Sequence, residues 1–281
     1  HVHYAIPHAY AGYMAKKMLE EEGIYVPMIT TLHGTDITLV GKHPFYKPAV
    51  TFSINQSDVV TSVSESLKKR TLETFDIKGE IEVIPNFIDT NKYKNTFTDC
   101  QRSNMATDEE RIVTHISNFR KVKRIPDVIR VFHKIQAKLP AKLIMVGEGP
   151  EKEGAEKLCE ALGISDRVIF LGNSNEIDKI LCFSDLFLLP SESESFGLAA
   201  LEAMVNRVPV ISSNAGGIPE VNNHGVTGFL SEIGAIDDMA KNAIAILEND
   251  ETLEAFKMNA IREAHKFDIK KVVPLYEEVY E

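Results

Sequence analysis

Short, continuously apolar runs recur along the chain, and segments with helical spacing separate them. The runs in the first third are PMITTLHG (27–34), SDVVTSVS (57–64) and EIEVIPN (80–86). Helical patterns lie between them over residues 44–57 and 64–75. Ser64 is placed to cap the second helix, with Leu67 and Leu72 on one side.

The same alternation restarts after residue 110. The predicted strands are RIVTHIS (111–117), AKLIMVGEG (141–149), RVIFLG (167–172), DLFLLP (185–190) and VPVISS (208–213). Helices are predicted between them over 125–139, 151–163, 175–184 and 191–204, the second closed by Gly163. Continuous apolar strands separated by helices indicate parallel sheets covered on both faces. The pattern predicts an α/β protein with two doubly wound, Rossmann-like domains, in which ligands bind beyond the carboxyl ends of the strands.

A polar segment without apolar periodicity, from Asn86 to about residue 110, indicates a domain boundary. We expect a first domain over 1–95, a second over 96–265, and a C-terminal helix over 266–281 that contains Pro274 and is a candidate for returning to the first domain. The chain starts with HVHYAI, which resembles the end of a strand, and it has no initiator Met. We therefore expect the first domain to be incomplete, with its N-terminal part preceding this chain.

Composition narrows the function classes. The chain of 281 residues is 44% hydrophobic and 26% charged, with a net charge of −10. These values favour a folded protein and argue against a general nucleic-acid or anionic-membrane binder. No apolar run is long enough to span a membrane and no signal peptide is recognisable, so a cytoplasmic location is expected. Cys100, Cys159 and Cys182 lack metal-ligand spacing and are expected to be reduced thiols.

The stretch SESESFGLAALEAM (191–204) carries the strongest chemical signal. It follows a predicted strand, and Gly197 lies near the start of the next helix. Free N–H groups at a helix start suit a phosphate, and the glycine lets a ligand approach. Glu194 in the loop and Glu202 inside the helix then address different parts of one ligand. A carboxylate can accept both hydroxyls of a ribose, so the spacing suits a nucleotide sugar.

These residues resemble the E-x7-E signature of retaining glycosyltransferases of family 4. NAGGIPEV (214–221), GVTGFL (225–230) and VIPNFID (83–89) resemble further segments of that family. The resemblance covers nearly the whole chain and implies the GT-B fold, with the two domains facing a cleft. It also implies a UDP-sugar donor contacted by the loop residues Ser195, Phe196, Gly197 and Leu198.

Four bases follow the strand at 111–117: Arg120, Lys121, Lys123 and Arg124. They read either as a solvated turn or as cations directed at a diphosphate. Lys123 matches a lysine of the family. The family's arginine position holds Asn118 here, and Arg120 is a candidate to supply the missing charge.

Other donor contacts follow from the resemblance alone. Gly147 lies in a turn (VGEGPE) that the family places beside the nucleotide, and Asn173 lies in the segment that reads the base. For Gly216 and Gly217 two interpretations stay open: close backbone approach near the sugar, or a plain turn.

In the first domain, TTLHGTD (30–36) places His33 at the carboxyl end of a strand. The family often has a histidine near the transferred sugar, so His33 is a catalytic candidate. This segment and HISNFRKVKR most resemble the bacillithiol-pathway subgroup, which transfers N-acetylglucosamine from UDP to the hydroxyl of L-malate. Tyr4, Thr31 and His33 are the candidate acceptor contacts. The remaining candidates for a malate dianion are Lys42, Lys47 and Arg70.

The implied mechanism retains configuration. Lys123, Arg120 and the helix start stabilise the leaving diphosphate, and Glu194 positions the sugar. No D-x-D stretch occurs, so no obligatory metal and no cofactor are expected. Alternatives are a different acceptor (lipid or polysaccharide), a UDP-sugar epimerase on the same fold, a non-catalytic sugar-nucleotide binder and, least favoured, a nucleic-acid module. A small hydroxy acid is the expected acceptor, and a homodimer is left open.

Overall fold

The computed structural model describes residues 1–41, 43–93, 100 and 102–281. They form two compact units, His1–Phe87 with Lys270–Glu281, and Ile88–Ile269. The predicted boundary between residues 95 and 96 lies outside the described residues. In the first unit, Nδ1 of His1 lies 2.7 Å from the Tyr280 hydroxyl, which joins the two ends of the chain.

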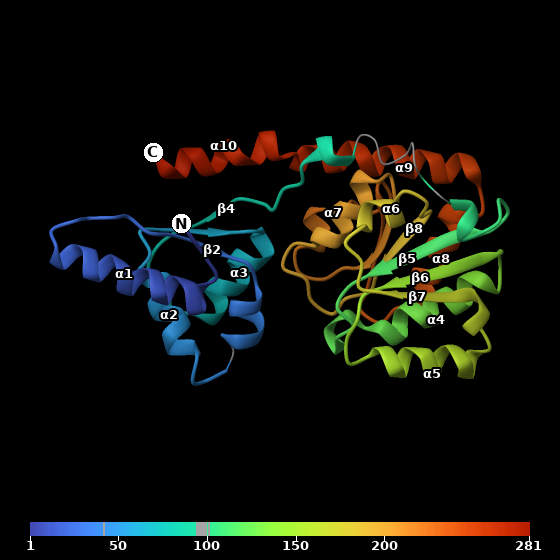
Figure 1. Ribbon diagram of the computed structural model, residues 1–281, viewed down its shortest axis with the longest axis horizontal. Helices are drawn as coiled ribbons and strands as arrows, with labels where there is room; N and C mark the ends of the chain where they lie inside the picture. Colours follow the sequence, from blue (N-terminus) through green and yellow to red (C-terminus); the bar gives the residue numbers. More distant parts are fainter. Residues whose placement is uncertain (42, 94–99, 101) are drawn as a thin grey trace. The chain divides into compact units, whose positions relative to one another are not determined.

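The first unit holds a parallel sheet in the order β1-β2-β3-β4 (Figure 1). Its strands are β1 (Val2–His3), β2 (Ile29–Leu32), β3 (Val59–Ser62) and β4 (Ile81–Val83). Its helices are α1 (Tyr10–Glu21), α2 (Lys47–Asn55), α3 (Glu65–Thr74) and most of α10 (Ile269–Tyr280). Ser64 caps α3 as predicted, because its Oγ accepts from the Leu67 N–H at 3.1 Å. Leu72, expected on the same side as buried Leu67, is 45% exposed, since five residues turn a helix well past one face.

The second unit holds a six-stranded parallel sheet in the order β10-β9-β8-β5-β6-β7. Its strands are β5 (Arg111–Ile116), β6 (Ala141–Val146), β7 (Val168–Gly172), β8 (Leu186–Leu189), β9 (Val210–Ser213) and β10 (Gly228–Ser231). Its helices are α4 (Ile125–Gln136), α5 (Lys152–Leu162), α6 (Ile177–Leu181), α7 (Leu198–Val205), α8 (Ile236–Leu247) and α9 (Asp250–Ala264). In Figure 1, α4 and α5 lie on one side of this sheet, and α7 and α9 on the other. The doubly wound prediction is therefore confirmed here.

The core of the second unit explains why its strands are continuously apolar. Every residue of β8 and of β9 is buried, because helices cover both faces of the sheet. Phe132 of α4 and Ile246 of α8 pack with Leu143 in one cluster, all of them fully buried. Each such side chain contributes about 1.5–3 kcal/mol by leaving water.

Two details differ from the sequence predictions. Helix α6 is shorter than the predicted 175–184. Cys100 and Cys182 form a disulfide with their Cα atoms 5.9 Å apart, whereas Cys159 is a buried free thiol. The expectation of three reduced thiols is therefore wrong for this pair. Their separation of 82 residues gave no spacing signal, since only the fold brings α6 beside residue 100.

Candidate active site

The strand order of the second unit fixes where a ligand fits. The chain moves from β5 outward to β6 and β7, and then returns to β8 beside β5 before continuing to β9 and β10. The connections after β5 and β8 therefore lead away in opposite directions. A sheet of this kind binds its ligand at this switch point, beyond the carboxyl ends of the two central strands.

Lys123 and Glu194 meet at the switch point. Lys123 ends a short 3-10 helix after β5, and Glu194 lies in the loop after β8. Nζ of Lys123 lies 2.6 Å from Oε1 of Glu194, and both side chains are largely buried. The Ser191 hydroxyl donates to the same oxygen at 2.8 Å. Sequence reasoning missed Ser191; its place directly after the strand was the available signal.

The backbone also joins these two loops. The N–H of Glu192 donates to the Val122 carbonyl at 2.8 Å. A cation and a carboxylate that were predicted separately are thus held as one unit. A diphosphate bound here would compete with Glu194 for the Lys123 ammonium.

Gly216 and Gly217 pack against the backbone of the loop that contains Glu194. Gly216 has a φ of 57°, and a Cβ there would lie 1.9 Å from the Glu194 carbonyl oxygen. A Cβ on Gly217 would lie 2.4 Å from the Ser195 carbonyl oxygen. The Gly217 N–H donates to the Glu194 carbonyl at 3.0 Å. Both glycines are thus needed for the packing of their backbone against the Glu194 loop, a reason that neither of the two earlier interpretations contains.

Gly197 is the residue that caps the start of helix α7, and its φ of 98° favours glycine. Glu202 lies inside this helix and is half-buried, and burial raises the pKa of its carboxyl group. In the part of the chain that the structure describes, no donor lies within hydrogen-bonding distance of that carboxylate. A desolvated carboxylate without a donor suits a ligand that brings hydroxyl groups.

The neighbours of Gly197 differ in exposure. The Phe196 ring is buried against Phe267, with ring centroids 5.5 Å apart, so it supports the loop. Leu198 is 43% exposed, and Ser195 is half-buried. Of these three side chains, those of Leu198 and Ser195 are accessible to a bound sugar-donor substrate.

The loop after β5 packs closely on the GEG turn after β6. A Cβ on Gly147 would lie 1.8 Å from the Ser117 carbonyl oxygen. The Phe119 N–H donates to the Glu148 carbonyl at 2.9 Å. This packing leaves the Asn118 side chain exposed, and that of Asn173 after β7 is also exposed. The glycine of the turn is thus needed for a neighbouring loop, whatever it contributes to a nucleotide.

The four predicted bases have different partners. Lys123 pairs with Glu194, and Arg124 pairs with Asp127 in the first turn of α4 at 2.5 Å. Arg120 and Lys121 are exposed and have no ion pair with any described residue. Of the bases without an ion pair to a described residue, Arg120 is nearest to Asn118 along the chain. It is therefore available to bind an anion.

The first unit brings His33 and Tyr4 together at the carboxyl ends of β1 and β2. Their ring centroids are 4.9 Å apart. Burial, with a smaller effect of His3, lowers the pKa of His33 to about 4, so its imidazole is neutral at pH 7. Tyr4 has a φ of 72°, a conformation that non-glycine residues rarely adopt and that clusters at functional sites. The Thr31 hydroxyl is fully buried and contacts Thr61 and His1, each at 2.7 Å.

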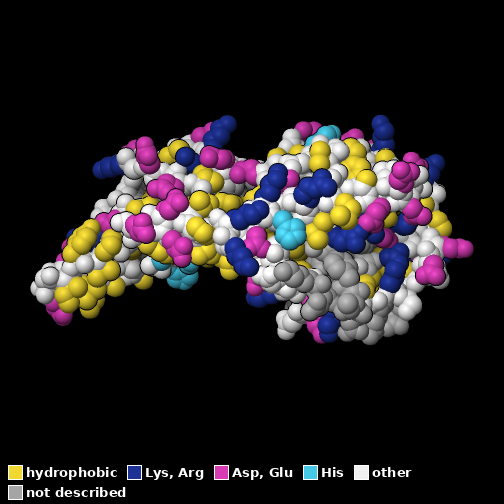
Figure 2. All heavy atoms as spheres, turned by 90° about the horizontal axis from the view of Figure 1, so that it is seen from above, with side chains coloured by type: hydrophobic (Ala, Val, Ile, Leu, Met, Phe, Trp, Pro, Cys, Tyr) yellow, Lys and Arg dark blue, Asp and Glu magenta, His cyan; other side chains and the backbone are white. Residues whose placement is uncertain are grey.

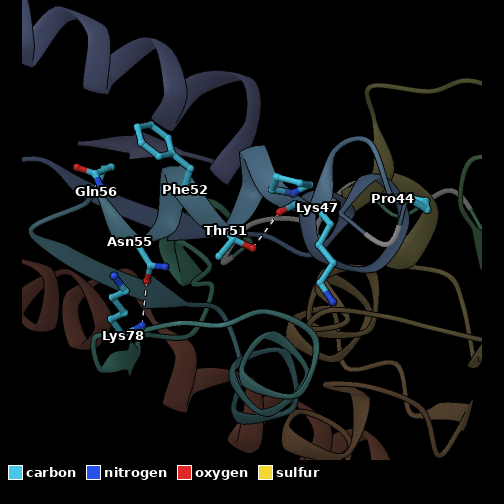
Figure 3. A pocket seen from close by; sticks show the side chains of 8 residues that line it. Pro44, Lys47, Thr51, Phe52, Asn55, Gln56 and Lys78 are labelled. Carbon is cyan, nitrogen blue, oxygen red and sulfur yellow. Dashed lines mark hydrogen bonds between the residues drawn. The ribbon is translucent and has the colours of Figure 1, made fainter.

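Two of the three cations considered for an acceptor dianion lie in the described part of the chain, on α2 and α3. Lys42 lies outside it. Lys47 lines a cavity of about 610 Å³ along α2 with Pro44, Pro48, Thr51, Phe52, Asn55, Gln56 and Lys78. Figure 3 shows the Lys47 and Lys78 side chains on opposite sides of that view, without converging. Arg70 lies on α3.

Metal binding, membrane crossing and nucleic-acid binding can each be checked against the described residues. Among them, no group of three or more His, Cys, Asp and Glu side chains could hold a metal ion. None of their helices has the length and apolarity needed to cross a membrane. On the face shown in Figure 2, Lys and Arg of the second unit are interspersed with Asp and Glu. A continuous basic surface for nucleic acid is not seen on that face.

Comparison with known proteins decides the family. The model for "Glycosyl transferases group 1" matches residues 97–263, and that for "Glycosyltransferase Family 4" matches residues 1–92. The chain is a group 1, family 4 glycosyltransferase. The N-acetyl-alpha-D-glucosaminyl L-malate synthase of Bacillus anthracis is 46% identical over all of this chain and 73% of its own length.

More distant glycosyltransferases agree. The 2-deoxystreptamine N-acetyl-D-glucosaminyltransferase of Niallia circulans is 25% identical over 96% of this chain and 72% of its own length. The structure of Anabaena HepE with UDP superposes with a TM-score of 0.85, at 23% identity over 97% of this chain and 75% of its own. Sucrose-phosphate synthase of Thermosynechococcus elongatus gives 0.83, at 19% identity over 99% and 71%. These structures establish the GT-B fold of this glycosyltransferase.

Proposed function

We propose that this glycosyltransferase transfers N-acetylglucosamine from UDP-N-acetylglucosamine to the hydroxyl of L-malate, with retention at the anomeric carbon. The observation that carries the proposal is the 46% identity, over the whole chain, with a protein named for that product. The wider glycosyltransferase relatives support a sugar donor, and the resemblance of the sequence motifs supports retention.

The donor fits the carboxyl end of the second sheet. Glu202 accepts hydrogen bonds from the ribose hydroxyls, which its half-buried carboxylate, without a donor among the described residues, favours. The diphosphate is assigned to the start of α7, where the N–H groups of Leu198 and Ala199 precede the first helical hydrogen bond, from Ala200 to the Gly197 carbonyl. Gly147 lies in the turn assigned to the nucleotide, and Asn173 lies in the segment assigned to the base. The side chains of Asn118, Ser195 and Leu198 complete the proposed donor contacts, and the buried Phe196 supports their loop.

Negative charge grows on the leaving phosphate as the glycosidic bond breaks. Lys123, with Arg120 beside it, stabilises that charge. Glu194 holds Lys123 and contacts the sugar, as a positioning residue rather than a nucleophile. We assign contacts with the sugar and the acceptor to His33, whose imidazole is neutral, and to Tyr4 and Thr31. The proposal needs no obligatory metal and no cofactor, and it places the protein in the cytoplasm.

A product assay tests the proposal. The protein is incubated with UDP-N-acetylglucosamine and each of L-malate, D-malate, lactate and citrate. Mass spectrometry should find the α-glycoside of L-malate in the reaction with L-malate, together with free UDP. Consumption of the donor without any acceptor would favour an epimerase instead. Transfer to a lipid or polysaccharide but not to a hydroxy acid would refute the proposed acceptor.

A further inference from the structure

A second histidine contacts His33 directly. His3 ends β1, and His33 follows the end of β2, its parallel neighbour. Nδ1 of His3 lies 2.8 Å from Nε2 of His33, with ring centroids 5.0 Å apart. Sequence reasoning did not select His3. The available signal was H-V-H at a strand end, because alternate residues of a strand share one face.

The backbone around His33 is hydrogen-bonded to neighbouring residues, whereas the His33 ring has few partners. The Asp36 carboxylate accepts from the Ala5 N–H at 2.8 Å, from the Gly34 N–H at 3.0 Å and from the His33 backbone. Tyr4 lies against the His33 ring. Among the described residues, His3 provides the one hydrogen bond to a His33 ring nitrogen.

Two neutral imidazoles can form this bond only if one nitrogen carries a proton and the other does not. The contact therefore couples the two tautomers. When His3 donates, His33 keeps its proton on Nδ1; when His33 donates, its Nδ1 is an acceptor. In either case Nδ1 of His33 is the nitrogen left for a substrate, and the bond to His3 fixes the plane of the ring.

We propose that His3 is a positioning residue for His33, holding its ring and setting its tautomer for the sugar and acceptor. The role rests on the proposed function of His33. It does not require His3 to touch a substrate. Partners of this kind, which orient a functional histidine, typically change activity by about 10–100-fold when they are removed.

Three substitutions of His3 separate positioning from simple structure. His3→Ala removes the bond. His3→Asn places an amide nitrogen or oxygen close to the position of Nδ1, whereas His3→Gln places it nearer to that of Nε2. His8→Ala is the matched control, because Nδ1 of the exposed His8 contacts the His3 carbonyl at 2.6 Å but not His33. UDP affinity and melting temperature report on folding.

In full-length protein, His3→Ala should lower kcat/KM for transfer about 10-fold or more, with parent-like UDP affinity. His3→Asn should recover most of the loss and His3→Gln little, while His8→Ala behaves like the parent. The double variant with His33→Ala should be no worse than His33→Ala alone. Parent-like activity of His3→Ala, equal rescue by Gln, or additive losses would overturn the proposal.

An activity-free measurement keeps this separate from the proposed function. Nitrogen-15 NMR of the His33 ring reports its tautomer, and the spectrum should change in His3→Ala but not in His8→Ala. If the parent makes no glycosyl malate, the proposed function fails, while an altered His33 spectrum still supports the pair. An unchanged His33 spectrum in His3→Ala would overturn the pair whatever the activity.

Discussion

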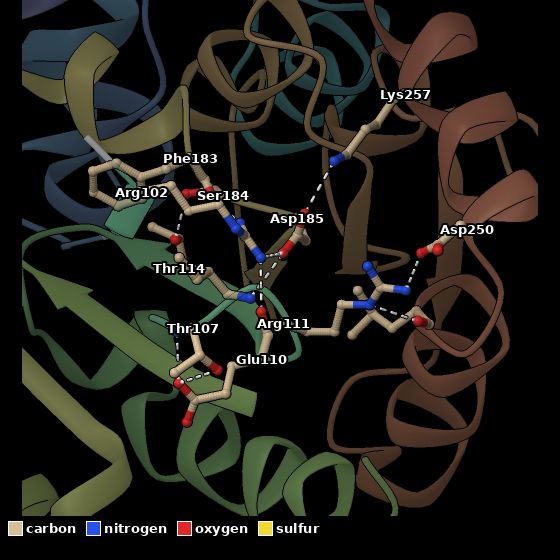
Figure 4. Close-up of polar contacts among 12 residues, drawn as sticks. Arg102, Thr107, Glu110, Arg111, Thr114, Phe183, Ser184, Asp185, Asp250 and Lys257 are labelled. Carbon is tan, nitrogen blue, oxygen red and sulfur yellow. Dashed lines mark hydrogen bonds and ion pairs between the residues drawn. The ribbon is translucent and has the colours of Figure 1, made fainter. Parts of the chain in front are cut away.

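The charged side chains at the two edges of the second sheet differ in the partners they have. At the amino ends of β5 and β8, the Asp185 carboxylate accepts from Arg102 at 2.8 Å, from the Ile112 N–H at 2.9 Å and from Lys257 at 3.0 Å (Figure 4). At the carboxyl ends, Glu202 has no hydrogen-bond donor and Arg120 has no carboxylate partner among the described residues.

This difference separates structural from functional charge. Burial alone would raise the pKa of Asp185, but Lys257, Arg102 and the Ile112 N–H lower it below its usual value. For Glu202, burial acts alone and raises the pKa. A buried charge with a full set of partners joins segments of the fold. A buried charge without them lowers the stability of the free protein, which is reasonable where a ligand supplies the missing partners.

The largest expected effect is at the structural edge. Asp185→Ala leaves Arg102 and Lys257 without their common carboxylate and should lower the free energy of unfolding by about 3–5 kcal/mol. UDP affinity of the folded fraction should not change. Because the folded pKa of Asp185 is lowered, its contribution is present above the ordinary carboxyl pKa and is lost as the pH falls through the folded value.

Urea unfolding and calorimetry with UDP measure both quantities. Asp250→Ala is the control, since Asp250 pairs with Arg111 at the same edge but its side chain is 87% exposed. That variant should cost at most about 1 kcal/mol. Equal costs for the two variants would remove the distinction between buried and exposed pairs.

At the opposite edge, Lys123→Ala should lower turnover by about 10²-fold or more, because its ammonium opposes the charge that forms on the leaving phosphate. Glu194 loses its cation in this variant, so Lys123→Arg serves as the control that keeps the charge. Steady-state UDP release with saturating donor measures turnover. A Lys123→Ala enzyme as fast as the parent would show that the pair with Glu194 is only structural.

Glu202→Gln should weaken UDP binding by about 10- to 150-fold, since a charged acceptor for the ribose hydroxyls is worth about 1.5–3 kcal/mol. Glu194→Gln should leave UDP affinity near that of the parent and lower turnover with the UDP-sugar. Calorimetry with UDP separates the two acids. Identical UDP affinities of both variants and the parent would contradict this division of roles.

The same variant has an opposite effect on stability. Burial raises the Glu202 pKa, so the folded state binds this proton more tightly than the unfolded state. The penalty is therefore full at pH 7 and disappears as the pH falls below the ordinary value of 4.5. Glu202→Gln should raise the free energy of unfolding at pH 7, and the gain should shrink toward pH 4. A loss of stability at pH 7 would contradict the donor-free carboxylate.

The smallest expected effect is that of Arg120→Ala, about 3–10-fold in turnover, because this exposed cation is screened by water and salt. Lys121→Ala, an exposed neighbour without an assigned role, is the control. The turnover rates of Arg120→Ala and the parent should differ at low salt and converge at high salt. A parent-like rate for Arg120→Ala at low salt would leave Lys123 as the working cation.

The sequence by itself determined the alternation of strands and helices, and with it the doubly wound fold. Continuous apolar strands such as β8 are buried on both faces in any such sheet, so their pattern is local and readable. It also placed Glu194, Gly197 and Glu202 around a helix start, because their spacing is fixed within one segment of 191–204.

Tertiary structure alone decided the partners. Lys123 and Glu194 are 71 residues apart in the chain, His3 and His33 are 30 apart, and the disulfide spans 82. Spacing carries no signal over such separations, since strand order decides which loops become neighbours. Likewise, Gly216 looked like either a turn or a ligand contact until the fold placed its α-carbon against the Glu194 carbonyl. The sequence gives the chemical type of each residue directly. The residue that contacts it in the folded protein depends on the order in which the strands pair.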